Sequence, residues 1–325
     1  MGASEKKTDS SFFYVGRFAP SPSAHLHFGS LIAATASYLC ARQHRQSKWL
    51  LRIEDIDEQR CHSKYSQSII QMLENYGFQW DDDIIYQSKR THIYQETLDS
   101  LDKYTYPCSC TRKQLSALTN NLKIGYIYPG LCRESLNNPE SAQFSTRLKT
   151  YNDPICFNDL CQNQHAFCQN IAQDIGDFIL KRSDGIFAYQ LAVVVDDAEQ
   201  GITHVVRGAD LFDNTPRQIY LQQLLGFPTP DYLHFPVAVN SDGKKLSKQN
   251  QSTGISNKNK RAQLINALQF LGQPITNDHY FESIEDLWKW ATQHWDVDLI
   301  PKQMKIHDDR TKGDTMSENM SENYE

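Results

Sequence analysis

Hydrophobic positions near the start of the chain form two short runs with a helical pattern between them. Residues 12–18 predict a strand, which the Pro-containing segment 19–23 ends. From about Gly29 to Ala41 the apolar residues recur at helical spacing, and residues 49–53 predict a second strand. A strand, a crossover helix and another strand are typical of a parallel sheet, so we predict an α/β fold.

Two amphipathic helices are predicted next, and Gly77 is expected to end the first of them. Their apolar faces consist of Ile69, Leu73 and Tyr76 in the first helix, and of Ile93, Leu98 and Leu101 in the second. Residues 105–135 differ in character, because three Cys, two Pro and two Gly gather there. This segment indicates an inserted module rather than a part of the sheet.

The chain from Asp177 to Asp210 predicts mainly strands, with a turn at 183–185. The expected strands cover residues 178–180, 187–195 and 202–206. A helix is predicted to start at Thr215, with the Thr hydroxyl as its cap and Pro216 in its first turn, and to end at Gly226.

The last third of the chain predicts one more strand and then helices. The strand covers residues 232–239, and the two helices are centred near Leu268 and Ala291. Residues 307–325 contain no Leu, Ile, Val, Phe or Trp, so we predict a disordered tail.

The composition and the absence of long apolar stretches argue against a disordered, a membrane-spanning or a secreted protein. The 325 residues are 39% hydrophobic, and their 15 Phe, 16 Tyr and 5 Trp exclude disorder as the main state. The apolar stretch around 192–195 is far shorter than a membrane span requires, and residues 1–7 lack the hydrophobic stretch of a secretory signal. We therefore expect a cytoplasmic protein with no membrane segment. Its net charge of −6 means that a nucleic-acid partner would need a local basic surface.

Cysteines are unusually frequent for this expected compartment. In the cytoplasm they should be reduced, which favours metal binding or packing over disulfides. The eight are Cys40, Cys61, Cys108, Cys110, Cys132, Cys156, Cys161 and Cys168.

The segment 16–30 carries the first candidate chemistry. His27 and Gly29 stand where a strand has ended and a helix begins, and a helix N-terminus suits a phosphate group. His27 can also donate a hydrogen bond to an oxygen that gains charge in a transition state. The alternative is a Pro-rich loop with solvated histidines at 25 and 27.

A second segment, residues 242–250, places Lys244, Lys245 and Lys248 on a turn. Three ammonium groups there could neutralise a triphosphate, although a solvated basic turn is the commoner explanation. The two segments occur in this order about 220 residues apart. Together they resemble the HIGH and KMSKS signatures of the class I aminoacyl-tRNA synthetases.

Further motifs resemble the glutamyl branch of these synthetases. They are RFAPSPS at 17–23, RIEDID at 52–57 and VRGADL at 206–211. The resemblance implies that Arg17 and Arg207 bind the carboxylates of glutamate, while Glu54 holds its α-amine and Tyr189 donates to a carboxylate oxygen. The alternative for the charged residues is ordinary surface ion pairing.

The same resemblance implies a complete set of site residues. The glutamate site would comprise Arg17, Phe18, Ala19, Pro20, Ser21, Glu54, Tyr189 and Arg207. The ATP site would comprise His27, Gly29, Ser30, Lys245, Leu246, Ser247 and Lys248, with His27 and Lys248 as the catalytic residues and Mg²⁺ bound with ATP.

Length and three motifs point to one shortened paralogue within that branch. Only 75 residues follow Asn250, and the polar tail takes the last 19, which leaves too few for a large anticodon-binding region. The chain is similar to the glutamyl-Q tRNA(Asp) synthetases at FAYQLAVV (187–194), ADL with TPRQ (209–218) and KLSKQN (245–250).

This resemblance implies a Rossmann-type catalytic domain with a parallel sheet, a zinc-containing acceptor-type insertion, a short helical C-terminal region and no anticodon-binding domain. The expected division is a flexible start at 1–11, catalytic halves at 12–104 and 176–250, the insertion at 105–175, the helical region at 251–306 and the tail at 307–325.

Cysteines in the insertion predict one structural zinc ion. Cys108, Cys110 and Cys132 with one phenol could complete a tetrahedral site, and the family resemblance selects Tyr128 over its rival Tyr126. The alternative is three buried thiols without metal. A second group, Cys156, Cys161, His165 and Cys168, could also bind a metal but has no family counterpart that we can name.

The family resemblance also implies the reaction. L-Glutamate is activated by ATP to glutamyl-adenylate without tRNA, and is then transferred to queuosine at the wobble position of tRNA(Asp). We expect a monomer that receives the anticodon loop in its catalytic pocket. The alternatives are a glutamyl-tRNA synthetase that charges the 3′ end of tRNA(Glu), and a non-catalytic tRNA-binding module.

Overall fold

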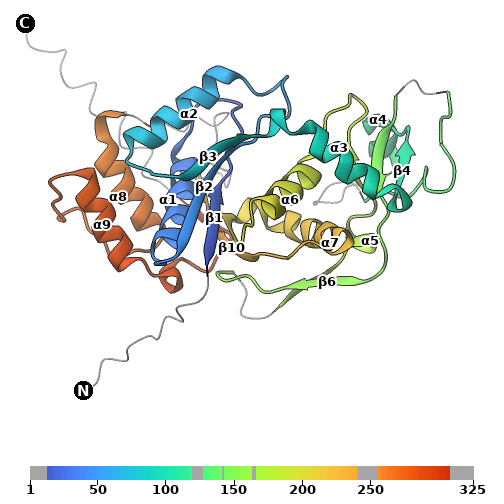
Figure 1. Ribbon diagram of the computed structural model, residues 1–325. Helices are drawn as coiled ribbons and strands as arrows, with labels where there is room; N and C mark the ends of the chain where they lie inside the picture. The colour runs from blue at the N-terminus through green and yellow to red at the C-terminus, as the bar shows by residue number, and fades with distance from the viewer. Residues whose placement is uncertain are drawn as a thin grey trace, which may run out of the picture.

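Parallel strands form the layer at the centre of the protein, seen in the computed structural model of Figure 1. The structure describes residues 13–118, 127–140, 143–162, 166–240, 255 and 257–307. Strands β1 (Tyr14–Phe18), β2 (Ser47–Ile53) and β3 (Asp81–Tyr86) pair in the order β1-β2-β3, all parallel. The helix α1 (Phe28–Arg42) connects β1 to β2, so the predicted parallel unit is confirmed.

A second parallel pair lies next to β1. Strands β9 (His204–Gly208) and β10 (Asp231–Phe235) pair with each other. The Thr203 amide donates to the Val15 carbonyl at 2.9 Å, which brings β9 beside β1. The carboxyl ends of these parallel strands therefore meet at one edge of the layer, where open α/β sheets bind their ligands.

Helices cover this layer and link it to the C-terminal region. The helix α2 (Ser63–Asn75) is followed by Gly77 at φ +76°, as predicted, and a Cβ there would lie 2.9 Å from Ile284. Figure 1 shows α8 (Lys260–Phe270) and α9 (Ile284–His294) at the end of the molecule that contains α1. The C-terminal region also holds a short strand, β12 (Lys305–His307), which pairs in parallel with β11 (Val237–Val239) and was not predicted.

The predicted strand at 187–195 is wrong. Residues Tyr189–Glu199 form a helix, α6. Its residues 191–195 are buried almost completely, so they are apolar without interruption, and such a run does not distinguish a strand from a buried helix.

The helix α7 (Thr215–Leu225) begins and ends as predicted, with Gly226 in the left-handed conformation. Asn214, however, occupies the cap position, and the Thr215 hydroxyl has another partner.

An antiparallel part lies at the end of the molecule away from α8 and α9 (Figure 1). Strands β4 (Thr105–Cys108), β5 (Ser145–Leu148) and β8 (Phe178–Lys181) form one sheet in the order β4-β5-β8. A hairpin of β6 (Pro154–Phe157) and β7 (Phe167–Asn170) follows β5 along the chain. The other helices are α3 (Thr91–Ser100), α4 (Arg112–Leu118), α5 (Ile171–Asp174) and the 3₁₀ helices Gln87–Lys89, Asp102–Tyr104, Ala209–Asn214, Asn257–Asn259 and Val297–Leu299.

Within the described residues, none of the helices combines the length and the apolar character needed to cross a membrane.

Candidate active site

A cavity of about 510 Å³ opens at the carboxyl ends of β1 and β9 and at the start of α1. Eleven residues predicted from the sequence line it: Arg17, Phe18, Ala19, Pro20, Ser21, His27, Gly29, Ser30, Glu54, Tyr189 and Arg207. The predicted Lys245, Leu246, Ser247 and Lys248 lie outside the described residues. Side chains from four separate elements thus face one space large enough for a small-molecule ligand.

A buried carboxylate fixes Arg17. Its Nε and Nη2 atoms donate to Asp197 Oδ1 and Oδ2 at 3.1 and 3.3 Å, in a bidentate pair. Two of the five guanidinium N–H groups are used in this way, while the side chain still lines the cavity. Asp197 therefore holds Arg17 from one side and leaves N–H groups for a ligand on the other.

Arg52 completes a buried charged network under the cavity. Its guanidinium lies 2.8 Å from Asp197, 3.5 Å from Glu54 and 3.7 Å from Asp196, and its side chain has no exposed surface. Charges that are taken out of water persist only when they are paired, so each group in this network depends on the others.

Burial raises the pKa of the Glu54 carboxyl to about 7, even though Arg52 and Arg17 act to lower it. Two opposing effects set this pKa: desolvation disfavours the charged carboxylate, and the two nearby cations favour it. Glu54 is thus close to its protonation midpoint at neutral pH and faces the cavity. A ligand cation beside it would favour the carboxylate.

Glu54→Gln is expected to become more stable relative to the wild type as the pH rises. A carboxyl whose pKa is raised on folding stabilises the protein fully below its ordinary value of 4.5, and this stabilisation is lost as the pH rises through about 7. The difference in unfolding free energy between the two proteins should change by about 1 to 3 kcal/mol between pH 5 and 8. Chemical denaturation at both pH values measures it, with Glu58→Gln as an exposed control. A pH-independent difference would contradict the buried, raised carboxyl.

Arg207 is a buried cation whose hydrogen-bond partners are all uncharged. Its Nε donates to His234 Nε2 at 3.0 Å, Nη1 to Gln218 Oε1 at 2.8 Å, and Nη2 to Thr215 Oγ1 at 2.7 Å. A longer contact, 3.4 Å, joins Nη1 to the Tyr189 hydroxyl. In the described part of the chain, none of the ion pairs involves Arg207. An unpaired buried charge is costly, so this arrangement suits a site that awaits an anion.

His27 stands at the start of α1 in an extended conformation. Its carbonyl accepts from the Ser30 and Leu31 amides at 2.8 and 3.1 Å, and no acidic residue lies in the first turn. The helix dipole and the amide groups of this turn therefore offer positive potential at the cavity, as an anionic ligand requires.

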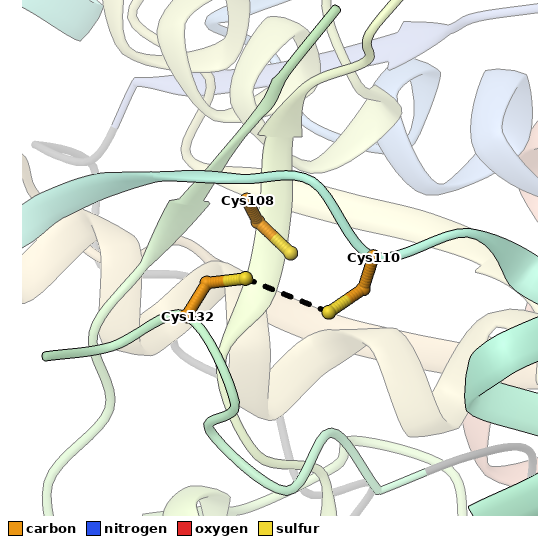
Figure 2. A group of neighbouring side chains, drawn as sticks. All are labelled: Cys108, Cys110 and Cys132. Atoms are coloured by element: carbon orange, nitrogen blue, oxygen red, sulfur yellow. Dashed lines mark hydrogen bonds between the residues drawn. The ribbon is translucent and has the colours of Figure 1, made fainter. Parts of the chain in front are cut away.

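A cluster of sulfur atoms lies in the antiparallel part of the molecule, away from the cavity. Figure 2 shows Cys108, Cys110 and Cys132 pointing toward one another, and their Sγ atoms all lie within 4.8 Å. The Tyr128 hydroxyl lies 3.3 Å from Cys108 Sγ and 3.7 Å from Cys110 Sγ. Thiolates about 2.3 Å from a zinc ion would be separated by roughly 3.8 Å, so these groups could hold one. The rival Tyr126 lies outside the described residues.

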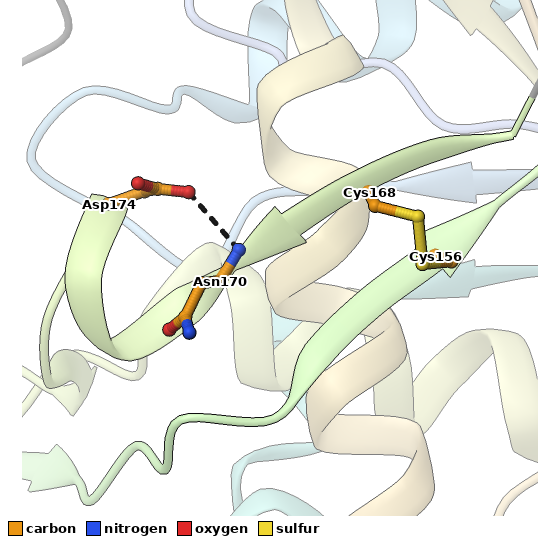
Figure 3. Close-up of a disulfide and its surroundings, with 4 residues drawn as sticks. All are labelled: Cys156, Cys168, Asn170 and Asp174. Carbon is orange, nitrogen blue, oxygen red and sulfur yellow. Dashed lines mark hydrogen bonds between the residues drawn. A yellow bond between two sulfur atoms is a disulfide. The ribbon is translucent and has the colours of Figure 1, made fainter.

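The second cysteine group does not form the suggested metal site. Cys156 and Cys168 face each other across the β6–β7 hairpin, with Cα atoms 4.1 Å apart, and form a disulfide (Figure 3). The expectation that all eight cysteines are reduced is therefore wrong for this pair. Cys161 lies apart, with its Sγ 3.8 Å from the Pro301 carbonyl, and His165 is outside the described residues. Strand register, which places two cysteines opposite each other, is not visible in sequence spacing.

Sequence reasoning missed several residues that shape the site. Asp197 follows the run that was predicted to be a strand, and His234 lies inside a predicted strand. Thr215 was assigned to a helix cap, whereas its hydroxyl accepts a hydrogen bond from Arg207. For Asp197, the one signal in the sequence was the pair of adjacent carboxylates at 196 and 197, which directly follows an apolar run.

The chain matches the family model described as class I tRNA synthetases (E and Q), catalytic domain, over residues 15–307. The chain is 47% identical over 289 residues to the glutamyl-Q tRNA(Asp) synthetase of Thiobacillus denitrificans. The matched region covers 88% of this chain and 95% of that protein. The corresponding protein of Dechloromonas aromatica is 46% identical over 297 residues, with 90% and 97% covered.

Solved structures agree on the fold. A glutamate tRNA ligase from Elizabethkingia meningosepticum, in complex with its amino acid, superimposes with a TM-score of 0.73 at 23% identity, over 90% of this chain and 66% of that one. The glutamate-tRNA synthetase of Elizabethkingia anophelis gives 0.74, also at 23% identity, over 93% and 69%. The chain therefore belongs to the class I tRNA synthetases, in their glutamyl-Q tRNA(Asp) synthetase family.

Proposed function

We propose that this protein is an ATP-dependent ligase that activates L-glutamate as glutamyl-adenylate and transfers the glutamate to queuosine in the anticodon loop of tRNA(Asp). The name shared by its relatives supports this function. The observation that carries it is that Arg17, Arg207 and Glu54 line one and the same cavity. These two cations and this carboxylate match the two carboxylates and the one ammonium group of glutamate, while the cavity is also lined by a second carboxylate, Asp210.

In the first step, the cavity residues bind and orient glutamate. Arg17 has N–H groups left beside its pair with Asp197, and Arg207 is held by neutral partners, so each can receive a carboxylate. Glu54 would accept the α-ammonium group, and Tyr189 would donate to a carboxylate oxygen. Phe18, Ala19, Pro20 and Ser21 would form the wall beside them.

ATP would lie at the start of α1. The backbone amide of Gly29, the Ser30 side chain and the His27 imidazole would face its phosphates, and Lys245, Leu246, Ser247 and Lys248 would complete the site. His27 and Lys248 would stabilise the charge that develops as the glutamate α-carboxylate attacks the α-phosphorus and pyrophosphate leaves. Mg²⁺ bound with ATP would screen the phosphate oxygens.

In the second step, a hydroxyl of queuosine would attack the carbonyl carbon of glutamyl-adenylate, the bond from that carbon to the phosphate oxygen would break so that AMP leaves, and the hydroxyl would lose its proton. The cyclopentenediol of queuosine presents a vicinal diol that resembles the terminal ribose of a tRNA, so one pocket can serve the transfer. We expect a monomeric, cytoplasmic enzyme, in keeping with our predictions from the sequence.

Exchange of labelled pyrophosphate into ATP tests the first step directly. We expect exchange that depends on glutamate and proceeds without tRNA. Glutamine is the matched control, because it lacks one of the two carboxylates. No exchange with glutamate would favour the alternative of a non-catalytic tRNA-binding module.

We also propose that Cys108, Cys110 and Cys132 with Tyr128 hold one structural zinc ion. The convergence of three sulfur atoms and a phenol supports this site. Cys108 and Cys132 are buried, which is typical of a closed structural site rather than a catalytic one. The metal would tie the β4 segment to the chain around Cys132.

Cys108→Ser is expected to lower both the zinc content and the thermal stability. The wild type should hold about one zinc ion per chain, and the variant should hold well under half, since a hydroxyl is a poor replacement for a thiolate. Elemental analysis and thermal denaturation measure the two effects. Cys61→Ser, a half-buried cysteine outside the cluster, serves as the control. An unchanged metal content in Cys108→Ser would mean that the ligands are misassigned.

A further inference from the structure

We propose that Asp159 and His234 are positioning residues which aim the Arg207 guanidinium into the cavity, and so set the affinity of the enzyme for glutamate. This inference rests on the proposed function, in which Arg207 binds a carboxylate. Neither residue lines the cavity. Both are buried, and they act through Arg207 rather than on the substrate.

The three side chains form a linear chain of hydrogen bonds. Asp159 Oδ2 lies 2.5 Å from His234 Nδ1, and His234 Nε2 lies 3.0 Å from Arg207 Nε. Since Arg207 Nε–H can only donate, His234 Nε2 must accept, and the single imidazole proton then lies on Nδ1, where it is donated to Asp159.

The surroundings favour this neutral tautomer. Burial lowers the pKa of His234, and Arg207 acts in the same direction, against the Asp159 carboxylate. The Thr215 hydroxyl accepts from Arg207 and lies 3.2 Å from His234 Nε2, so it can donate to the same lone pair. A proton on Nε2 would instead place an N–H group against the guanidinium.

Asp159 is itself held rigidly. Its Oδ1 accepts from the backbone amides of Cys161, Gln162 and His234 at 3.0, 2.8 and 3.3 Å. The Leu160 amide donates to the Tyr232 carbonyl at 2.9 Å, which fastens this turn to β10. The carboxylate therefore stands at a fixed distance behind the imidazole and cannot rotate away.

A count of the five N–H groups of Arg207 shows which of them remain available to a ligand. Four N–H groups point to His234, Gln218, Thr215 and, at 3.4 Å, Tyr189. One N–H on Nη2 is left without an acceptor among the described residues, and the contact to Tyr189 is the weakest of the four. The Asp159–His234 pair thus fixes one side of the Arg207 guanidinium, while the free donor on the other side is kept for a ligand.

Two substitutions of His234 separate positioning from simple packing. In His234→Asn the side-chain amide can reach Asp159 but not Arg207, whereas in His234→Gln an amide oxygen can take the place of Nε2 and accept from Arg207. We expect the Asn variant to raise the KM for glutamate in pyrophosphate exchange about tenfold, as the loss of one hydrogen bond to a charged group predicts. The KM for ATP should change less than about twofold, and the Gln variant should restore most of the glutamate affinity.

Equal effects of Asn and Gln, or a rise in both KM values together, would overturn the proposal in favour of a merely structural role. Should His234→Asn not fold, Asp159→Asn gives the same test. Its amide would donate to Nδ1 and force the proton onto Nε2, and an unchanged KM for glutamate would overturn the proposal.

Arg207→Gln, assayed in parallel, distinguishes a failure of the positioning role from a failure of the proposed function. If Arg207→Gln raises the KM for glutamate and His234→Asn does not, the positioning role fails and the proposed function stands. If Arg207→Gln has no effect either, the assignment of Arg207 to glutamate fails as well.

Discussion

Arg207→Gln should lower kcat/KM for glutamate in pyrophosphate exchange by about two to four orders of magnitude. In the proposed function this guanidinium meets a substrate carboxylate in a buried site, where the loss of one partner of a charged pair costs about 3 to 5 kcal/mol. The neutral partners of Arg207 cannot take over the contact, since His234, Thr215 and Gln218 all accept hydrogen bonds from it. Exchange rates measured over a range of glutamate concentrations give the value.

Two variants act as controls for this effect. Arg207→Lys keeps the charge but loses the planar guanidinium, so it should recover part of the activity and not all of it. Arg42→Gln removes a half-buried arginine that pairs with Asp81 away from the cavity, and should leave exchange close to the wild-type rate. Full activity of Arg207→Gln would contradict the role of this residue in binding glutamate.

Asp197→Asn should destabilise the fold by about 3 to 5 kcal/mol, the largest stability effect that we expect. The carboxylate accepts from both Arg17 and Arg52, and all three side chains are buried. Its loss leaves two buried guanidinium groups without their shared counter-ion, and a charge stranded in this way is strongly destabilising. The thermal midpoint should fall by roughly 5 to 15 °C.

Glu199→Gln is the matched control for Asp197→Asn. It removes a carboxylate from the same helix, α6, whose partner Arg90 also pairs with Asp196. The side chain of Glu199 is 45% exposed, so its loss should cost less than about 1 kcal/mol. Equal costs for the two variants would mean that the network under the cavity does not hold its charges as described.

Local patterns in the sequence predicted the frame of the site because each is set within a short segment. The strand, helix and strand of residues 14–53 follow from hydrophobic periodicity, and the end of α2 follows from Gly77. The candidate residues around the cavity came from motifs and a family resemblance. Three of them, Arg17, Glu54 and Arg207, are far apart in sequence, and the parallel layer is what brings them to one edge.

Features that depend on the register between segments were not predictable in this way. A strand was predicted for residues 187–195, most of which belong to α6. The reason is that burial on all sides removes the polar face by which a helix is recognised in a sequence. Because of that error Asp197 was not predicted as a site residue. The α6 helix directs the Asp197 side chain inward, where it pairs with Arg17. The Cys156–Cys168 disulfide and the Asp159–His234 contact likewise depend on pairing between strands and loops, which spacing along the chain does not reveal.

The acceptor of the glutamate can be identified directly. Purified protein is incubated with labelled glutamate and ATP, together with tRNA(Asp) that either contains or lacks queuosine, and the label on the tRNA is counted. We expect label only on the queuosine-containing tRNA(Asp). Equal labelling of the two tRNAs, or label on the 3′ end of tRNA(Glu) instead, would contradict it.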